Sequence, residues 1–422
     1  MRPTVLAGIV ACALAVLAGP SAAVAVPKPA HPGSRRHTVK PRRRAGVQHT
    51  GLANAKRARP KPKPKPKKPV SSPPAPSSGP STPPAPSATP PAASDPSLAA
   101  PTSPTPPAPP ATPSPPAAPA ISGVTYYVSP SGSDSNSGTS PAQAWRTVAR
   151  VNSAALAPGD GVLFEGGQSF SDQDLMPSSS GTAEEPIVLG SYGQGQATIT
   201  QGAWFVQHDL AFENLAFDNT FYGGSAVHGP SDDITLDGVT ISLPAGNQAL
   251  GLYANGDHWV IENSQISDTG LSGMLLGGDD YLITDNTISD TGLDTTNGYN
   301  NHGIYLDASD ATITGNTITS FAESAVSVRY RNATIADNAF SGGQIGIDYY
   351  QTDTVAGTSD WTDNTISDTT VADLFVCGTA EGCNEPLGSF TITDNQLSKT
   401  TGVYMNLQPA TGTYTVSSNQ LS

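Results

Sequence analysis

Short apolar segments broken by a polar turn recur from about residue 210 to the end of the chain. Each unit places an apolar residue on either side of a turn centred on Asn, as in Ile283-Thr-Asp-Asn-Thr-Ile288. Successive turn centres lie 22 to 31 residues apart, and the flanking segments alternate Ile, Val, Leu, Tyr or Thr with polar residues. This period and alternation predict a solenoid built from short β-strands. The turn centres are Asn214, Gly238, Asn263, Asn286, Asn316, Asn338, Asn364, Asn395 and Asn419.

The repeated Asn has a physical reason in such a solenoid. A corner between two strands needs a residue with left-handed backbone, which Asn tolerates and Gly replaces freely. Side-chain amides stacked about 4.8 Å apart can also hydrogen-bond to one another in a ladder. We therefore expect an all-β solenoid of about ten coils from residue 160 onward, with these positions in one line along its axis.

The start of the solenoid carries a different pattern. Trp145, Val148 and Val151 are spaced by three residues, which is typical of an apolar stripe on a helix. We predict a short helix over residues 141–155. A helix there would cover the open end of the coil, where strand edges would otherwise be unpaired.

Three segments near this end resemble secreted proteins of the pectin-lyase-like superfamily, whose fold is a right-handed parallel β-helix. They are Tyr126-Tyr-Val-Ser-Pro-Ser-Gly-Ser-Asp134, Pro141-Ala-Gln-Ala-Trp-Arg-Thr-Val148 and Gly159-Asp-Gly-Val-Leu-Phe164. With the repeats, the resemblance covers roughly residues 124–422. It implies the fold but not the activity, because this fold hosts lyases, hydrolases, epimerases and proteins that are not enzymes.

Composition divides the chain into four regions. Residues 1–25 have a basic start, a short apolar run and a small-residue cleavage motif, so we expect a signal peptide and a secreted, extracellular protein. Residues 26–68 are basic, and residues 69–120 form a linker rich in Pro, Ser and Ala; both lack the apolar residues needed to fold. Residues 121–422 form the predicted β-helix domain.

Charge is distributed unevenly between these regions. Residues 1–120 hold 16 basic residues and one acidic residue, a net charge of +15, whereas the remainder holds 5 and 34, a net charge of −29. The basic segment should bind anionic cell-wall polymers and attach the protein to the wall. It has no aromatic residues to stack on bases, so nucleic acid is not an expected partner. We expect the protein to be a monomer.

Cysteine usage fits an exported chain. Cys12 falls within the predicted signal peptide, which leaves Cys377 and Cys383. An even number of cysteines in an exported protein predicts one disulfide between them, and two free thiols are the alternative.

One face of the predicted coil carries groups that could do chemistry. In strands such as Gly303-Ile-Tyr-Leu-Asp307, Ala325-Val-Ser-Val-Arg329 and Gly346-Ile-Asp-Tyr-Tyr350, the Ile, Leu and Val residues alternate inward. The outward positions of all such strands form two columns. One column holds Tyr253, Leu275, Tyr305, Ser327, Asp348 and Tyr404, and the other holds Asn255, Gly277, Asp307, Arg329, Tyr350 and Asn406.

These columns predict a polysaccharide-binding groove. Tyrosine rings can stack on sugars, and Asp, Arg, Asn and His can bind hydroxyls or transfer protons. An insertion at residues 290–301 ends at His302 and would form a wall of the groove. The alternative is a solvated sheet face without function. We interpret His302, Tyr305, Asp307, Arg329 and Asp348 as the catalytic candidates. The substrate-binding candidates are Tyr253, Asn255, Tyr350, Tyr404 and Asn406.

The reaction itself stays open at this point. Asp307 and Asp348 should lie roughly 12 Å apart between Cα atoms, a separation that suits an inverting glycoside hydrolase better than a retaining one. In this reading Arg329 pairs with Asp307 and lowers its pKa, and Asp348 donates the proton. A uronic-acid lyase or epimerase would use His302 or Tyr305 as base and Arg329 to neutralise the substrate. A glycan-binding adhesin without catalysis also fits.

No metal site is predicted. The acidic pairs Asp232-Asp233 and Asp279-Asp280 read as polar turns rather than metal ligands. No cofactor is expected, except that calcium would be needed for a domain of charge −29 to bind a polyuronate.

Overall fold

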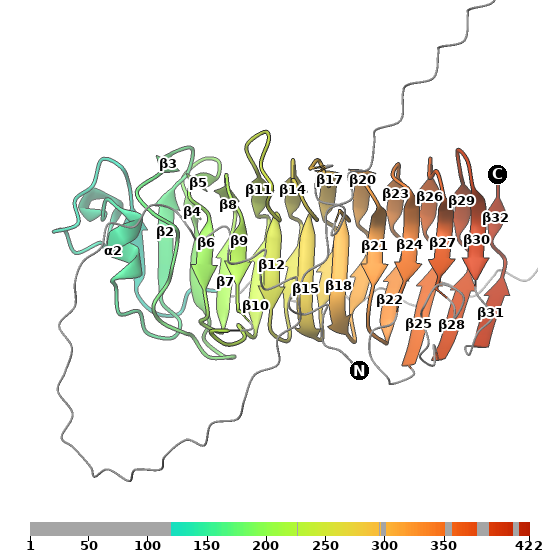
Figure 1. The fold of residues 1–422 in the computed structure, drawn as a ribbon. Coiled ribbons are helices and arrows are strands. Elements are labelled where there is room, and N and C mark those ends of the chain that lie inside the picture. The colour runs from blue at the N-terminus through green and yellow to red at the C-terminus, as the bar shows by residue number, and fades with distance from the viewer. Residues whose placement is uncertain are drawn as a thin grey trace, which may run out of the picture. The chain divides into compact units, whose positions relative to one another are not determined.

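The computed structural model describes residues 120–225, 227–294, 296, 301–350, 357–377, 388–407 and 413–422. The predicted signal peptide, basic segment and nearly all of the linker fall outside these residues. The described chain winds into one long coil, with strands side by side along the axis from the helical end to β32 (Figure 1). No helix among the described residues reaches the length and hydropathy of a membrane span.

Three parallel sheets run the length of the coil, and each full coil contributes one strand to each sheet. We name them sheets A, B and C, with 12, 11 and 9 strands among the described residues. Sheet A contains β1 (Thr125–Val128), β2 (Gly161–Glu165), β4 (Ile187–Tyr192), β7 (Leu210–Glu213), β10 (Ile234–Asp237), β13 (Val260–Glu262), β16 (Leu282–Thr284), β19 (Thr312–Thr314), β22 (Ala333–Ala336), β25 (Gly357–Thr362), β28 (Gly388–Thr393) and β31 (Thr413–Ser417).

The other two sheets follow in chain order. Sheet B contains β3 (Ser169–Phe170), β5 (Ala197–Ile199), β8 (Leu215–Phe217), β11 (Thr240–Ser242), β14 (Gln265–Ser267), β17 (Thr287–Thr291), β20 (Thr317–Phe321), β23 (Ala339–Ser341), β26 (Thr365–Ser367), β29 (Gln396–Ser398) and β32 (Gln420–Leu421). Sheet C contains β6 (Ala203–Phe205), β9 (Phe221–Gly223), β12 (Leu252–Asn255), β15 (Met274–Asp279), β18 (Ile304–Ser309), β21 (Ser324–Val328), β24 (Ile345–Tyr349), β27 (Ala372–Val376) and β30 (Val403–Leu407).

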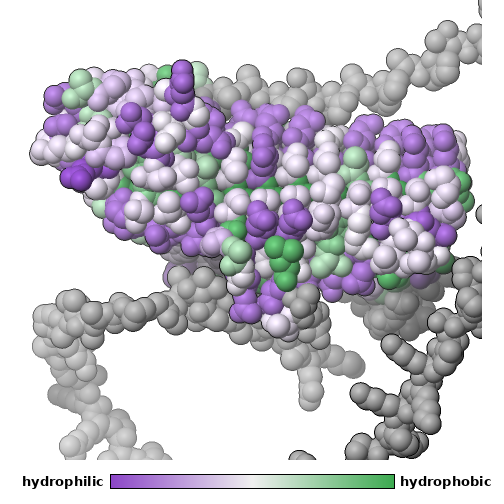
Figure 2. All heavy atoms as spheres, turned by 90° about the horizontal axis from the view of Figure 1, so that it is seen from above, coloured by the Kyte–Doolittle hydropathy of each residue, from purple (hydrophilic) through white to green (hydrophobic). Residues whose placement is uncertain are grey.

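Apolar side chains fill the inside of the coil in stacks, one from each rung. In sheet A the stack runs through Ile283, Ile313, Ile335 and Trp361, which are register partners and are fully buried. Burying such a side chain contributes roughly 1.5–3 kcal/mol. Most outward positions are polar, and the face of the coil in Figure 2 is mainly hydrophilic or neutral with small hydrophobic patches. The alternation predicted from the sequence therefore sets which residues can reach a ligand.

The Asn ladder is confirmed from Asn286 onward. The Asn316 side chain donates to Asn338 Oδ1 at 3.0 Å and accepts from Asn286, and the pattern continues to Asn419. Five of these six amides are buried, and their donors also reach backbone carbonyls of neighbouring rungs. Stacked amides therefore satisfy the buried polar atoms of this corner.

The prediction that all nine turn centres form one line was wrong. Asn214, Gly238 and Asn263 have positive φ of 52°, 61° and 51°, but in later coils the residue before the ladder Asn takes that role. By register, Asn263 is therefore the counterpart of Asp285, and Ser264 is the counterpart of Asn286. The corner holds two adjacent positions, a left-handed one and a buried one, and Asn serves at either.

The capping helix is shorter than predicted. Residues 141–155 contain a 3₁₀ turn, η1 (Pro141–Gln143), and a five-residue helix, α2 (Val148–Asn152). Trp145 lies between them in a parallel bridge with Val128, so it cannot be helical. Trp145, Val148 and Val151 are nevertheless buried, as the stripe predicts.

Candidate functional site

Outward residues of β18, β21 and β24 form the centre of the predicted groove. Tyr305, Ser327 and Asp348 are direct register partners on three successive rungs of sheet C. Their neighbours Ile304, Leu306, Val326 and Val328 are fully buried in the core, so these three side chains point away from it. The register also confirms the order Tyr253, Leu275, Tyr305 and the order Asn255, Gly277, Asp307.

The last position in each of the two predicted columns, Tyr404 in one and Asn406 in the other, was wrong. The sequence reading omitted β27, whose Phe375 is the partner of both Asp348 and Asn406. Asn406 therefore belongs to the column of Asp348, two rungs away, and Tyr404 lies beside Asp373. The misalignment arose because the sequence pattern pairs Gly402 with Gly346, whereas the register places Gly346 in line with Asp373 and Tyr404. The Tyr404 ring is covered by Lys399 Nζ at 4.4 Å, and its hydroxyl donates to the Ser422 carbonyl.

Asp348 supplies the carboxyl group of the column that it forms with Tyr305 and Ser327. Its side chain is 3% exposed, and its Oδ2 accepts a hydrogen bond from Ser324 Oγ at 2.7 Å. Its Oδ1 is buried and has no hydrogen-bond partner among the described residues, and the same holds for Ser327 Oγ on the adjacent rung. Buried polar atoms without partners are costly and rare, which makes this position a candidate for ligand binding.

His302 lies at the edge of this column and is 4% exposed. Burial lowers its pKa to about 4, with the charge of Asp348 raising it and that of Arg329 lowering it. Its Nε2 lies 3.4 Å from Glu323 Oε2, and its ring centroid is 5.4 Å from that of Tyr305. His302 is therefore a neutral imidazole near neutral pH.

The guanidinium group of Arg329 lies over two aromatic rings. Its guanidinium lies 4.8 Å from the Tyr305 ring centroid and 4.9 Å from that of Tyr350. Among the described residues no ion pair within 4.0 Å joins Arg329 to Asp307, so the predicted pair was wrong. The predicted pKa of Asp307 was also wrong in direction, because burial raises it and the charge of Arg329 lowers it by less.

Glu323 belongs to the same group and was missed in the sequence. It directly precedes β21, and burial raises the pKa of its carboxyl group; a backbone hydrogen bond from Asn301 and the charge of Arg329 lower it, and the charge of Asp348 raises it. The sequence signal that could have identified Glu323 is an acidic residue directly before β21, one rung from His302. We call His302, Tyr305, Asp307, Glu323, Arg329 and Asp348 the sheet C cluster.

The remaining predicted residues lie around this cluster. Tyr253 stacks on Tyr222 with centroids 4.3 Å apart, and Leu275 is its partner on the other side, so its ring edge and hydroxyl are what a ligand would meet. Burial raises the pKa of Tyr253. Cys377 is buried and disulfide-bonded, but Cys383 lies outside the described residues, so their pairing stays a prediction.

The insertion before His302 is described only in part. Asp294 accepts hydrogen bonds from the backbone N–H and hydroxyl of Thr296, and Gln248 donates to that hydroxyl at 3.5 Å. Gly292 has a φ of 73°, and a Cβ there would lie 2.8 Å from Asn301 Cβ. This segment thus packs beside the residues that precede β18 and β21 of sheet C, where a groove wall is expected.

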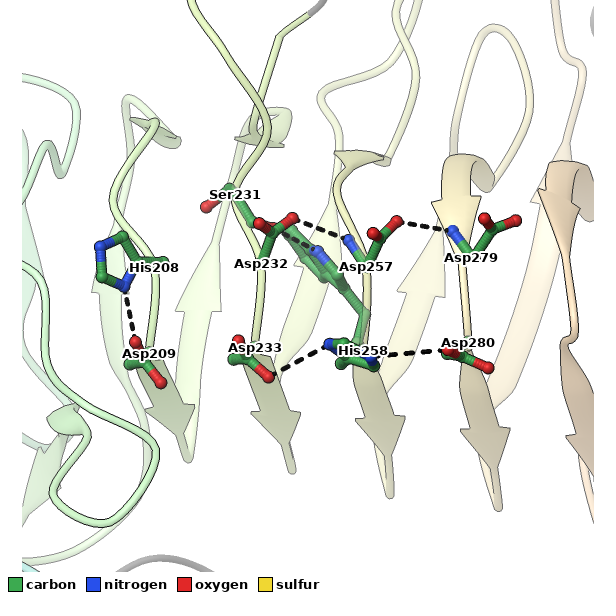
Figure 3. A network of polar contacts seen from close by, with 10 residues as sticks. His208, Asp209, Ser231, Asp232, Asp233, Asp257, His258, Asp279 and Asp280 are labelled. Carbon is green, nitrogen blue, oxygen red and sulfur yellow. Dashed lines mark hydrogen bonds and ion pairs between the residues drawn. The ribbon is translucent and has the colours of Figure 1, made fainter.

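At the corner between sheets C and A, carboxylates of the acidic pairs accept hydrogen bonds from backbone N–H groups (Figure 3). Asp232 Oδ1 accepts from the Asp257 N–H, and Asp257 Oδ1 accepts from the Asp279 N–H, each at 2.9 Å. Next to them, His258 lies 3.4 Å from Asp233 and 3.5 Å from Asp280. These contacts support the polar-turn interpretation. Over the described ranges, no group of three or more His, Cys, Asp or Glu side chains could hold a metal ion.

Neutral His302 should make the protein sensitive to acid. The unfolded histidine has a pKa of 6.5 and the folded one about 4, so below pH 6.5 only the unfolded chain gains this proton. The free energy of unfolding therefore has its full value above pH 6.5. It falls by up to about 3 kcal/mol as the pH is lowered toward 4. We expect His302→Gln to reduce this loss, as measured by urea unfolding at about pH 7 and about pH 4.5. Equal pH dependence in both proteins would contradict a buried neutral His302.

Comparisons with known proteins agree with this architecture. A family described as "Right handed beta helix region" matches residues 250–421. A solved GH136 lacto-N-biosidase from Eubacterium ramulus is similar with a TM-score of 0.50 and 16% identity, covering 70% of this chain and 67% of that chain. Together with the parallel sheets, these matches show the predicted right-handed parallel β-helix, pectin-lyase-like fold.

One curated relative matches more closely over a short stretch. A lacto-N-biosidase from Bifidobacterium longum subsp. longum is 46% identical over 76 residues, which is 17% of this chain and 5% of the relative. This chain therefore spans about one-twentieth of that protein's length.

Proposed function

We propose that this right-handed parallel β-helix protein binds a glycan along sheet C and hydrolyses a glycosidic bond beside Asp348. The observation that carries the proposal is the Asp348 carboxyl group itself. It is buried on an outward column, one oxygen accepts from Ser324, and the other has no hydrogen-bond partner among the described residues. A sugar hydroxyl or an attacking water would satisfy that oxygen.

The neighbouring groups suit glycoside hydrolysis. That reaction needs two carboxyl groups, one that holds a proton and one that is ionised. The sheet C cluster holds two further carboxyl groups whose pKa is raised by burial, Asp307 and Glu323. Of these two, Glu323 interacts electrostatically with Asp348. Arg329 and the rings of Tyr305 and Tyr350 provide a surface for sugar rings and hydroxyls.

A lyase or epimerase is supported less well. Such an enzyme needs a cation to neutralise the substrate carboxylate. Of the five Lys and Arg residues after residue 120, Arg329 is the one that belongs to the sheet C cluster. Neutral His302 could accept a proton, but its low pKa makes it a weak base. The similarity to lacto-N-biosidases also favours hydrolysis of an oligosaccharide.

A glycan screen with the purified full chain tests the proposal. The panel contains neutral polysaccharides, polyuronates and oligosaccharides ending in lacto-N-biose, and both new reducing ends and unsaturated uronides are measured. We expect new reducing ends without unsaturated products. Unsaturated products would identify a lyase instead. Retention on a glycan array without any product would identify a binding protein.

A further inference from the structure

The backbone of Glu323 is hydrogen-bonded to the coils on both sides. Its N–H donates to the Asn301 carbonyl at 3.0 Å, and its own carbonyl accepts from the N–H groups of Gln344 and Ile345 at 2.9 Å each. The preceding and following coils therefore hold it in place. Its side chain is 34% exposed, so part of it reaches the surface of sheet C.

The carboxyl group of Glu323 faces the interior of the sheet C cluster. Its Oε2 lies 3.4 Å from His302 Nε2, and the charges that act on it are those of Asp348 and Arg329. His302 itself interacts with Asp348 and Arg329, so these four groups form one set. Asp307 interacts with Arg329, but Asp348 is not among the groups that shift its pKa.

The pair of carboxyl groups around His302 is therefore Glu323 and Asp348, rather than Asp307 and Asp348. Burial and the negative charge of Asp348 favour the protonated form of Glu323. Buried His302 stays neutral, so it can hydrogen-bond to Glu323 without removing its proton. Asp348 accepts a hydrogen bond from Ser324, and its other carboxyl oxygen has no hydrogen-bond partner in the part of the chain that the structure describes.

We propose that Glu323 is the proton donor of the sheet C cluster and that His302 is the residue that positions it. This inference rests on the proposed hydrolase function and names a further catalytic residue within it. The Glu323 O–H bond breaks as the proton passes to the glycosidic oxygen, which keeps the electron pair of the breaking C–O bond. Water supplies the hydroxyl group to the sugar carbon, and its remaining proton goes to Asp348. Proton exchange with solvent then restores Glu323 and Asp348.

The test compares the full chain with four variants, one of them a control, on two kinds of substrate. Wild type is assayed on the oligosaccharides of the panel and on 4-nitrophenyl glycosides, whose leaving group needs little protonation. Glu323→Gln should lower kcat/KM on oligosaccharides by about 100-fold or more, but on the nitrophenyl glycosides by less than about tenfold. Its pH profile should lose the alkaline limb. Glu323→Asp should retain that limb at a reduced rate.

His302→Gln should shift the alkaline limb without removing it, because the proton donor remains. Glu213→Gln is the matched control, since burial also raises the pKa of that carboxyl group but Glu213 lies on β7 of sheet A. It should leave kcat/KM and the pH profile unchanged. Thermal unfolding of every variant checks that the fold is intact.

Two results would overturn the inference in distinguishable ways. If wild type cleaves a substrate and folded Glu323→Gln keeps both its oligosaccharide rate and its alkaline limb, Glu323 is not the donor and the hydrolase proposal stands. If wild type cleaves neither kind of substrate, the hydrolase proposal fails, and the role of Glu323 fails with it.

Discussion

Replacing Asp348 by Asn is expected to lower the turnover of a cleavable glycan by about a thousandfold or more. The change removes the carboxylate that accepts a proton from water but keeps the shape of the side chain. Glycan affinity should therefore stay within about tenfold of wild type. Initial rates of reducing-end formation and isothermal titration calorimetry measure the two quantities separately.

The matched control is Asp360→Asn on β25 of sheet A, which makes the same chemical change away from sheet C. It should leave turnover unchanged. Asp348 is buried, and one of its oxygens has no hydrogen-bond partner within the described ranges, so Asp348→Asn should not lower the thermal stability. Turnover of Asp348→Asn within about tenfold of wild type would place the reaction elsewhere.

Replacing Asn338 by Ala is expected to cost roughly 3 kcal/mol or more of unfolding free energy. Asn338 Oδ1 accepts from the backbone and side chain of Asn316, and its Nδ2 donates to the Ile313 and Ala336 carbonyls and to Asn364. Removing the amide leaves several buried groups without partners. Urea unfolding followed by circular dichroism measures the loss, and hydrogen exchange should locate it in the coils of β19, β22 and β25.

Asn263→Gly provides the comparison. Asn263 occupies the same place in the sequence motif, but its side chain is exposed and its φ is 51°, which Gly adopts freely. We expect this change to cost less than about 1 kcal/mol. Similar losses for the two variants would mean that the ladder does not stabilise the fold.

The fold could be predicted because one local motif recurs with a nearly constant period. The turn around Asn316 and the alternation of Ile304 and Leu306 with polar residues are both readable without structure. The sequence did not show which Asn residues form the ladder, because Asn is accepted both at the left-handed corner position and at the buried ladder position. The backbone angle and the burial of the side chain, which only the structure shows, separate Asn263 from Asn286.

Those site residues could be predicted that lie within strands, where inward and outward side chains alternate. Strand periodicity placed Tyr305, Ser327 and Asp348 in one column, and the register confirms it. It gave no information on Glu323, which precedes its strand, or on the direction of the long Arg329 side chain. Charge alone suggested an ion pair with Asp307, whereas the guanidinium lies over two tyrosine rings.

The parallel register also fixes the spacing of side chains along the axis of sheet C. Groups in one column can differ in axial position only by whole rungs of about 4.8 Å, since no strand can shift by half a step without losing its hydrogen bonds. Tyr305 and Asp348 are thus two steps apart. Insertion or loss of one complete coil would change such a separation by one step and leave the rest of the sheet intact. Substrate selectivity in this architecture can therefore diverge in units of single coils, as well as by side-chain replacement.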